Sequence, residues 1–265
     1  MKKDKKVIVF DLDETIGSFT QLYKFWYLIN LFFNKNIDNK YFYSILDNNI
    51  LFLRPNMINI FNNIKQKKIN NLCSNVIIYT NNNGDFFWVE LIKDYIKNKI
   101  QYKVIDKIIR AYKIDNQPCE TCRTTYEKTL ADFLRCSELP KNTKICFFDD
   151  RIHEHMIHDN VLYVNLTPYD YYIRYSELCK KFYNNNKFWV VFEEHNKTYK
   201  QFYDHIKKNT DESYIKKNLK TSVETNIEKM VSRHIMRVIN KFLKDTNNMN
   251  YTKKKKLYKH KTIKY

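Results

Sequence analysis

Two aspartates two residues apart form the strongest chemical motif of this 265-residue chain. Asp11 and Asp13 directly follow a short apolar run, Val7 to Phe10, so both carboxyl groups are expected on a loop that leaves a strand. An ionised aspartate can attack phosphorus and form an aspartyl-phosphate, while a second carboxyl can protonate the leaving group and later activate water. The pair therefore predicts phosphoryl transfer; the alternative is that the acids only cap the loop.

A phosphate dianion repels such carboxylates, so the chemistry needs cations and hydrogen-bond donors. Asp149 and Asp150 end another apolar run and can complete a site for Mg²⁺, which prefers oxygen ligands. Thr80, with Asn81 after it, can offer a hydroxyl and backbone N–H groups to phosphate, and Lys128 can supply a cation. We therefore predict Mg²⁺ as the cofactor and these side chains as its ligands and phosphate-binding partners.

Apolar, β-branched runs end at three of these polar positions. The predicted strands are Val7–Asp11, Val76–Thr80 and Ile145–Asp149, with Val161–Leu166 as a fourth. Helical patterns over 55–68, 86–99 and 124–136 separate them. This alternation predicts an α/β fold with a mainly parallel sheet, and such sheets bind ligands at the carboxyl ends of their strands.

The chain holds only two glycines, and both follow predicted strand ends. Gly17 comes shortly after Asp13, and Gly84 shortly after Thr80. Glycine is needed where the backbone adopts a positive φ or passes close to a ligand. The placement favours a site at these strand ends, with two coincidental turns as the alternative.

The order Asp-x-Asp-x-Thr, Thr, Lys and Asp-Asp at successive strand ends resembles the haloacid dehalogenase (HAD) superfamily of phosphatases. Within it, Asp11-Leu-Asp-Glu-Thr15 together with Leu53-Arg-Pro-Asn56 and Phe61 resembles the RNA polymerase C-terminal-domain phosphatases and NLI-interacting-factor-like phosphatases. The similarity covers roughly residues 5–175. It implies a Rossmann-like HAD fold, with a small cap or flap insert over 18–50.

The resemblance also implies roles for individual residues. Asp11 matches the nucleophile and Asp13 the general acid and base, while Thr80 and Lys128 match the phosphoryl-binding pair. Mg²⁺ would be held by the Asp11 carboxylate, the Asp13 backbone carbonyl and Asp149.

Asp150 stands at the second, variable position of the last family motif. Three features depart from the branch: Asn56 replaces a usual glycine, Thr80 continues as Asn-Asn-Asn-Gly, and the 18–50 insert is long and aromatic. Packing is the favoured interpretation of this insert over a docking surface.

The resemblance implies a phosphorylated protein or peptide as substrate, because this branch lacks a large cap. A nucleic-acid 3′-phosphate end or a small molecule is the alternative with the same chemistry. A binding module of the same fold without activity is the third hypothesis.

Positive charge is concentrated toward the end of the sequence. The net charge is +18, and residues 251–265 carry seven lysines and no acidic residue. We predict that this segment is disordered. A contact with nucleic acid or an acidic surface and a merely solubilising role are both compatible with it. An AT-rich genome, such as that of a parasite or a large DNA virus, would also enrich lysine and asparagine.

Beyond a phosphatase domain over 1–183, residues 184–250 predict a mostly helical extension. Lys187–Phe192 is a candidate edge strand, and apolar residues recur at helical spacing over 223–242. The opposite face of that helix would carry basic side chains: Arg233, Arg237, Lys241 and Lys244. A solvated face is favoured over a phosphate-contacting surface.

Six cysteines without framework spacing indicate a reducing compartment, cytoplasmic or nuclear. Cys73 and Cys146 are predicted to be buried thiols. Two motifs contain residue types that bind metals: Cys119 with Cys122, and His153 with His155 and His158. A second metal site is not favoured at either, because the sequence offers no further ligands to complete a four-ligand zinc site. No signal peptide and no membrane association are expected.

Overall fold

The computed structural model describes residues 5–35, 37–84, 86–211 and 221–244. These residues fall into two compact units. Unit 1 takes them from the ranges 1–15, 56–168 and 230–265, and unit 2 from 16–55 and 169–229. The predicted insert over 18–50 therefore belongs to the same unit as residues 169–229, and the boundary predicted at 183 lies inside unit 2. The segment predicted to be disordered, 251–265, lies outside the described residues.

Unit 1 contains a five-stranded parallel sheet in the order β3-β2-β1-β6-β7. The strands are β1 (Lys6–Phe10), β2 (Asn75–Tyr79), β3 (Lys107–Ile109), β6 (Lys144–Asp149) and β7 (Val161–Asn165). A two-residue hairpin, β4 (Lys113–Ile114) and β5 (Gln117–Pro118), stands apart from this sheet. The predicted α/β fold with a parallel sheet is confirmed, in a Rossmann-like arrangement.

The central strands are buried on both faces, which explains their continuous apolar runs. Val7, Ile8, Val9 and Phe10 of β1 are fully buried. Such runs suit a sheet covered by helices on both sides. All four predicted strands are confirmed, whereas β3 and the hairpin were not predicted.

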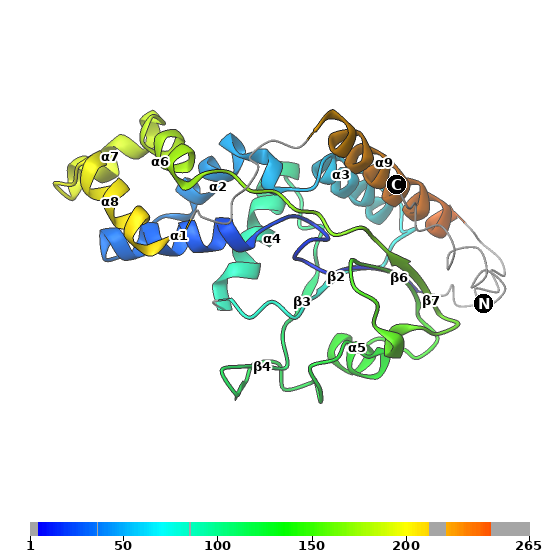
Figure 1. Cartoon of the computed structure of the whole chain (residues 1–265). Coiled ribbons are helices and arrows are strands. Elements are labelled where there is room, and N and C mark those ends of the chain that lie inside the picture. Colours follow the sequence, from blue (N-terminus) through cyan, green and yellow to red (C-terminus); the bar gives the residue numbers. More distant parts are fainter. Residues whose placement is uncertain (1–4, 36, 85, 212–220, 245–265) are drawn as a thin grey trace. The chain divides into compact units, whose positions relative to one another are not determined.

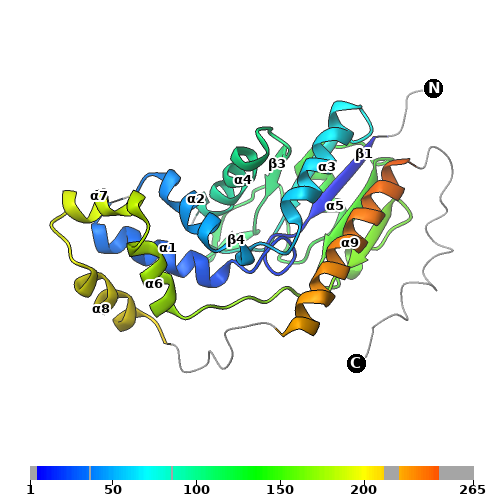
Figure 2. The same cartoon turned by 90° about the horizontal axis from the view of Figure 1, so that it is seen from above.

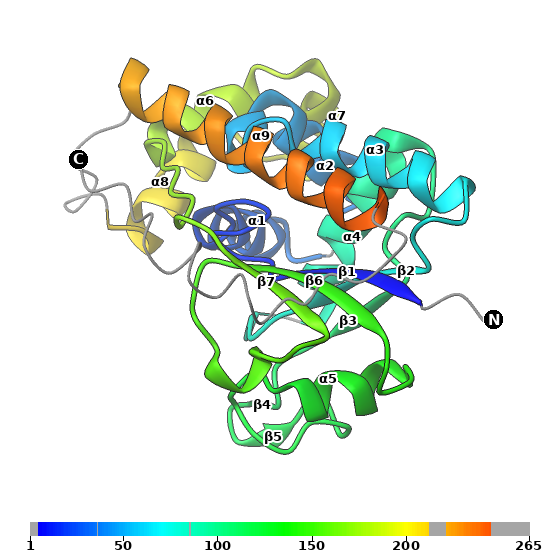
Figure 3. The ribbon, with the colours of Figure 1, turned by 90° about the vertical axis from the view of Figure 1, so that its right-hand side faces the viewer.

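Helices cover the two faces of this sheet (Figures 1 and 3). The helices α3 (Met57–Ile69), α4 (Phe86–Ile100) and the unit 1 part of α9 (Ser222–Lys244) lie on one face, and α5 (Leu130–Ser137) lies on the other. The Phe10 ring meets Phe61 of α3 edge to face, with the ring centroids 5.6 Å apart. On the opposite face Val9 packs in one cluster with Phe133 of α5.

The last predicted helix, 124–136, begins later than expected. Thr129 caps α5 by accepting a hydrogen bond from the Asp132 N–H, so residues 124–128 form a loop. Lys128 therefore lies just before the helix.

Unit 2 is helical (Figure 2), and it is rich in aromatic side chains. Its elements are α1 (Thr20–Phe33), α2 (Asn39–Asn48), the short 3₁₀ helix η1 (Ile50–Phe52), α6 (Tyr175–Tyr183), α7 (Asn186–Glu194), α8 (Tyr199–Asn209) and the first residues of α9. Phe25 of α1, Phe182 of α6 and Phe202 of α8 pack together, with ring centroids 5.1 to 6.3 Å apart. The predicted packing of the 18–50 aromatics is thus observed within this unit.

The edge strand predicted over Lys187–Phe192 was wrong, because these residues lie in helix α7. Phe188 and Phe192 are buried and contact Phe182 of α6. In a helix, positions i and i+4 lie about 6 Å apart along the axis, so both rings can reach Phe182, whereas in a strand they would lie about 13 Å apart. Tertiary packing has overridden strand propensity here.

Neither glycine adopts a positive φ. Gly17 instead permits a close backbone approach within unit 2: a Cβ there would lie 2.4 Å from the Phe52 carbonyl oxygen. Of the two reasons that sequence analysis gave for the glycines, a positive φ therefore does not apply. The left-handed backbone occurs at Asn56 (φ 65°), the position where the resembling branch has glycine, and asparagine tolerates this conformation.

Helix α9 confirms the helix predicted over 223–242 and its exposed basic face. Arg233, Arg237, Lys241 and Lys244 are all exposed, whereas Ile235 and Ile239 are fully buried. Among the described residues, no helix is long and apolar enough to cross a bilayer.

The cysteines differ from the prediction in one respect. Cys73 and Cys146 are buried free thiols as expected. Cys122 and Cys136, however, form a disulfide that ties the loop before Lys128 to α5. The lack of a framework spacing did not reveal this pair, since spacing along the chain gives no information on which side chains meet in space.

Candidate active site

The candidate site lies at the carboxyl ends of the two central strands, β1 and β6. The chain leaves β1 toward β2 on one side, while β6 adjoins β1 on the other, so the strand order reverses between them. Parallel α/β sheets bind ligands at such a switch point. Asp11 follows β1 directly and Asp149 ends β6, and the Asp11 N–H donates to the Phe148 carbonyl at 2.9 Å. Strand pairing thus fixes the two acids side by side.

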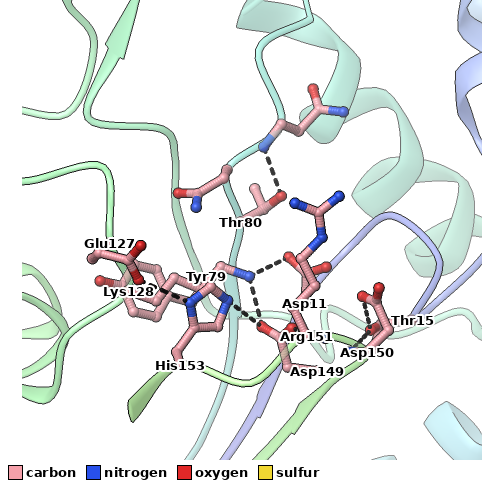
Figure 4. A network of polar contacts seen from close by, with 12 residues as sticks. Asp11, Thr15, Tyr79, Thr80, Glu127, Lys128, Asp149, Asp150, Arg151 and His153 are labelled. Carbon is pink, nitrogen blue, oxygen red and sulfur yellow. Dashed lines mark hydrogen bonds and ion pairs between the residues drawn. The ribbon is translucent and has the colours of Figure 1, made fainter. Parts of the chain in front are cut away.

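Lys128 connects these two carboxylates. Its Nζ lies 2.5 Å from Asp11 Oδ1 and 2.7 Å from Asp149 Oδ2 (Figure 4). All three side chains are nearly inaccessible to solvent. The ammonium group therefore offsets part of the negative charge that the strand ends bring together.

Asp150 completes an acidic cluster with Asp11 and Asp149. One carboxylate oxygen of each residue lies within 4.8 Å of the other two. Within the described residues, Asp11 Oδ2 and Asp150 Oδ2 have no hydrogen-bond partner. Hard oxygen donors with free lone pairs at this spacing can hold a metal ion.

A tight turn after Asp13 holds Asp150 in place. Glu14 adopts a left-handed backbone with φ 56°, which is uncommon for a residue other than glycine. The turn brings Thr15 against Asp150: the Asp150 N–H donates to Thr15 Oγ1 at 3.1 Å, and the hydroxyl lies 3.3 Å from Asp150 Oδ1. The loop after β1 and the end of β6 are thereby locked together.

Asp13 has surroundings of its own. Its Oδ2 accepts a hydrogen bond from the Asn82 amide at 2.6 Å, while its buried Oδ1 has no partner among the described residues. Burial raises the pKa of Asp13 to about 7, although the Asn82 hydrogen bond opposes the rise, and Asp11 adds to it. A carboxyl group that keeps its proton near neutral pH can act as a general acid.

The pKa values of the other charged groups are shifted by burial and by the charges and hydrogen bonds of their partners. Burial raises the pKa of Asp11 to about 6 despite the opposing charge of Lys128. Burial acts to lower the pKa of Lys128, but the charges of Asp11 and Asp149 outweigh it and raise the pKa. Burial acts to raise the pKa of Asp149, but hydrogen bonds from His153 and Lys128 hold it below the ordinary value. Lys128 is therefore a cation and Asp149 an anion at neutral pH.

Thr80 and Asn81, predicted to bind phosphate, have different partners. Thr80 Oγ1 accepts from the Asn82 N–H at 3.0 Å, and no described residue accepts its hydroxyl hydrogen. The Asn81 side chain, in contrast, accepts from Arg123 at 2.7 Å and donates to the Tyr126 carbonyl at 3.0 Å. The hydroxyl of Thr80 is available to a ligand, whereas the amide of Asn81 fixes the loop before Lys128.

Arg123 is the residue that sequence reasoning missed in this loop. Its buried guanidinium donates to the carbonyl oxygens of Thr80 (3.2 Å), Arg110 (2.8 Å), Tyr126 (3.0 Å) and Glu127 (3.1 Å), besides the Asn81 side chain. It thereby joins the end of β2 to the residues just before Lys128. Nothing in the sequence distinguishes it from other arginines, because its acceptors are main-chain carbonyls.

His153 belongs to the histidine motif for which sequence analysis did not favour a metal site. The structure places it beside Asp149, with Nε2 3.5 Å from Asp149 Oδ2 and Nδ1 3.4 Å from Glu127 Oε2 (Figure 4). His155 and His158 are exposed, and Cys122 is in the disulfide. In the described parts of the chain, neither motif therefore gathers a set of zinc ligands.

Comparisons with protein-family models, with curated proteins and with solved structures found no match for this chain.

Proposed function

We propose that this protein is a magnesium-dependent phosphatase of the HAD type, in which Asp11 attacks a phosphomonoester and forms an aspartyl-phosphate. The observation that carries the proposal is the convergence of Asp11, Asp149 and Asp150 around the buried ammonium of Lys128. The resemblance of the Asp11–Thr15 segment to this superfamily supports the same chemistry.

The donor set fits Mg²⁺. Asp11, Asp149 and Asp150 would hold the ion through hard oxygen atoms, which Mg²⁺ prefers over nitrogen or sulfur. The ion would offset negative charge on the phosphoryl oxygens and favour the ionised form of Asp11.

The residues of the chain divide the remaining tasks. Lys128 holds Asp11 in place and supplies a positive charge near the transferring group. Thr80 can donate its hydroxyl to a phosphoryl oxygen, while Asp13 gives its proton to the leaving oxygen. Asp13, once deprotonated, then accepts a proton from the water that attacks the aspartyl-phosphate.

The favoured substrate is a phosphoserine or phosphothreonine side chain of a protein or peptide, as the resembling branch implies. The basic residues 251–265 motivate the alternative, a 3′-phosphate end of a nucleic acid, through the same chemistry.

The test is a phosphatase assay with and without Mg²⁺ on four substrates: an aryl phosphate, a phosphoserine peptide, a nucleotide and a 3′-phosphorylated oligonucleotide. We expect metal-dependent release of phosphate, with the highest kcat/KM on the peptide. Asp11→Asn should lower kcat by about 10⁴-fold or more, since it removes the nucleophile.

Asp159→Asn is the matched control, because it removes the same charge from an exposed position of unit 1. It should leave turnover unchanged. Absence of turnover on every substrate by the wild-type protein, folded and loaded with Mg²⁺, would overturn the proposal in favour of a binding module.

A further inference from the structure

Arg151 lies one residue beyond the acidic pair Asp149-Asp150, and its main chain is fixed on both sides. Its N–H donates to Asp149 Oδ1 at 2.8 Å, and its carbonyl accepts from the Tyr163 hydroxyl at 2.7 Å. The backbone of Arg151 is thus held by a carboxylate of the metal-binding cluster itself. The Cα atom of Arg151 is therefore held at a fixed position at the edge of the site.

The side chain of Arg151 is exposed and directed at the site. Figure 4 shows it extending from the end of β6 in the direction of Thr80, with the guanidinium drawn between Thr80 and Asp11 in this view. In the part of the chain that the structure describes, this guanidinium makes no hydrogen bond, ion pair or ring contact.

Three other arginines of unit 1 have partners of their own, whereas the exposed Arg233 and Arg237 of α9 make no hydrogen bond or ion pair with the described residues. Arg123 donates to carbonyl oxygens, Arg110 pairs with Glu90 at 2.8 Å, and Arg135 pairs with Asp132. Arg151, although it adjoins Asp150, forms no such pair with any residue that the structure describes. Its guanidinium is therefore available to an anion that comes from outside the chain.

The charge of the site calls for such a cation. The carboxyl groups of Asp11, Asp149 and Asp150 face one ammonium, that of Lys128, which already pairs with two of them. With Mg²⁺ bound, the ion and Lys128 would balance the three carboxylates, so a phosphate dianion would still add two negative charges without a matching cation. A guanidinium presents parallel N–H groups that match two oxygens of one phosphate, which a single ammonium cannot do.

We propose that Arg151 is a phosphate-binding residue that grips two non-bridging oxygens of the substrate phosphoryl group and so selects monoesters over diesters. This inference rests on the proposed function. A monoester dianion offers three terminal oxygens, one for Thr80 or the metal ion and two for the guanidinium. A diester has only two terminal oxygens and one negative charge, so it loses part of this contact.

Two measurements on Mg²⁺-loaded protein test the inference. Calorimetry with inorganic phosphate should show binding to the wild type that is weakened about tenfold in Arg151→Gln, with Arg151→Lys in between. Kinetics should show that Arg151→Gln lowers kcat/KM on an aryl phosphate about 100-fold and that on the corresponding diester much less, so that the monoester preference shrinks.

Arg237→Gln is the control, since it removes an equal charge from the exposed face of α9 and should leave both measurements unchanged. Equal phosphate binding and equal monoester preference in wild type and Arg151→Gln would overturn the inference while the phosphatase proposal stands. Phosphate binding that depends on Arg151, in a protein that hydrolyses no substrate, would uphold Arg151 as a phosphate-binding residue, but it would overturn the monoester selection and the proposed function. Absence of phosphate binding by the wild type would overturn the inference as well.

Discussion

The two aspartates of the first motif have different surroundings. Asp11 is paired with Lys128, whereas Asp13 lies against an amide and has one buried oxygen without a partner. Burial raises the pKa of Asp11 to about 6 and that of Asp13 to about 7. One carboxyl can therefore be ionised while the other keeps its proton, which is the division that a nucleophile and a general acid need.

This difference predicts a bell-shaped pH dependence of kcat/KM, which reports the groups of the free enzyme. Below about pH 6 Asp11 takes up a proton and cannot attack, so the rate falls toward acid; a bound cation shifts this limb to lower pH. Above about pH 7 Asp13 loses the proton that the leaving group needs, so the rate falls toward alkali. Asp13→Asn should lower kcat about 100-fold or more and abolish the alkaline limb. An alkaline limb that persists in this variant would assign the acid to another group.

The same shift predicts how stability changes with pH. Folded Asp13 holds its proton to about pH 7, whereas the unfolded residue releases it near 3.8, the ordinary pKa of an aspartate. The folded state thus binds more protons between these values, so the contribution of Asp13 to the free energy of unfolding falls as pH rises from about 4 to 7. Relative to wild type, Asp13→Asn should gain roughly 1–3 kcal/mol on going from pH 4 to pH 8, as measured by urea unfolding. No relative gain would show that Asp13 is ionised in the folded protein.

At the scale of elements, the loop before α5 decides where Lys128 lies. Arg123 joins it to the end of β2, and the Cys122–Cys136 disulfide joins it to α5. Thr129 then starts the helix. The cation of the site is therefore presented by an irregular segment that is held at several points rather than by the sheet.

Removal of the buried guanidinium should destabilise this loop strongly. Arg123→Met would leave the carbonyl oxygens of Arg110, Tyr126 and Glu127 without their buried donor, and we expect a loss of about 3 kcal/mol in the free energy of unfolding. Arg237→Met, on the exposed face of α9, should change it by less than about 0.5 kcal/mol. Similar losses in both variants, from urea unfolding, would contradict the role given to Arg123.

The disulfide makes stability depend on redox conditions. It links residues 14 apart in sequence, and a cross-link of this length stabilises by about 3 kcal/mol through the unfolded chain. Treatment with dithiothreitol should lower the free energy of unfolding by about 2–3 kcal/mol in wild type. Cys122→Ser, measured as control, should be insensitive to the reductant; an insensitive wild type would show that the bond does not form in solution.

At the scale of the whole molecule, every residue of the proposed chemistry comes from unit 1, between Asp11 and His153. The strongest positive charge lies elsewhere in the sequence, in 251–265. Catalysis and any contact with a polyanion are thus separable along the chain.

Deletion of 251–265 should therefore leave kcat/KM on an aryl phosphate unchanged within about twofold, because no proposed site residue is removed. The same deletion should weaken binding of an oligonucleotide and flatten the dependence of that affinity on salt, since seven lysines are lost. An unchanged salt dependence would assign oligonucleotide binding to other basic residues.

Much of the fold and the site follows from local sequence, and the exceptions share one cause. The runs Val7–Phe10 and Ile145–Asp149 are apolar because both faces of their strands are buried, so their pairing and the meeting of Asp11 with Asp149 could be predicted. Strand β3 was not predicted, because a strand of three residues is too short to give a recognisable pattern. The helix over Lys187–Phe192 could not be predicted from propensity, because its conformation depends on distant aromatic partners.

The sequence likewise could not predict the contacts of three site residues: Arg123, His153 and Asn81. Each depends on contacts with residues that are 26 to 43 positions away or on main-chain carbonyls. Asn81 shows the limit most clearly: its place after a strand end predicted phosphate binding, but not that its side-chain amide contacts Arg123 and Tyr126.

The most direct test of the phosphatase proposal is to trap the phosphorylated enzyme. The Asp13→Asn variant keeps the nucleophile but lacks the base that activates water, so the aspartyl-phosphate should accumulate on it. Acid quenching after mixing with Mg²⁺ and a radiolabelled aryl phosphate, followed by peptide mapping, should find hydroxylamine-labile label on the peptide that contains Asp11. Hydroxylamine-labile label on another peptide, with none on the peptide that contains Asp11, would contradict the assignment of Asp11 as the nucleophile.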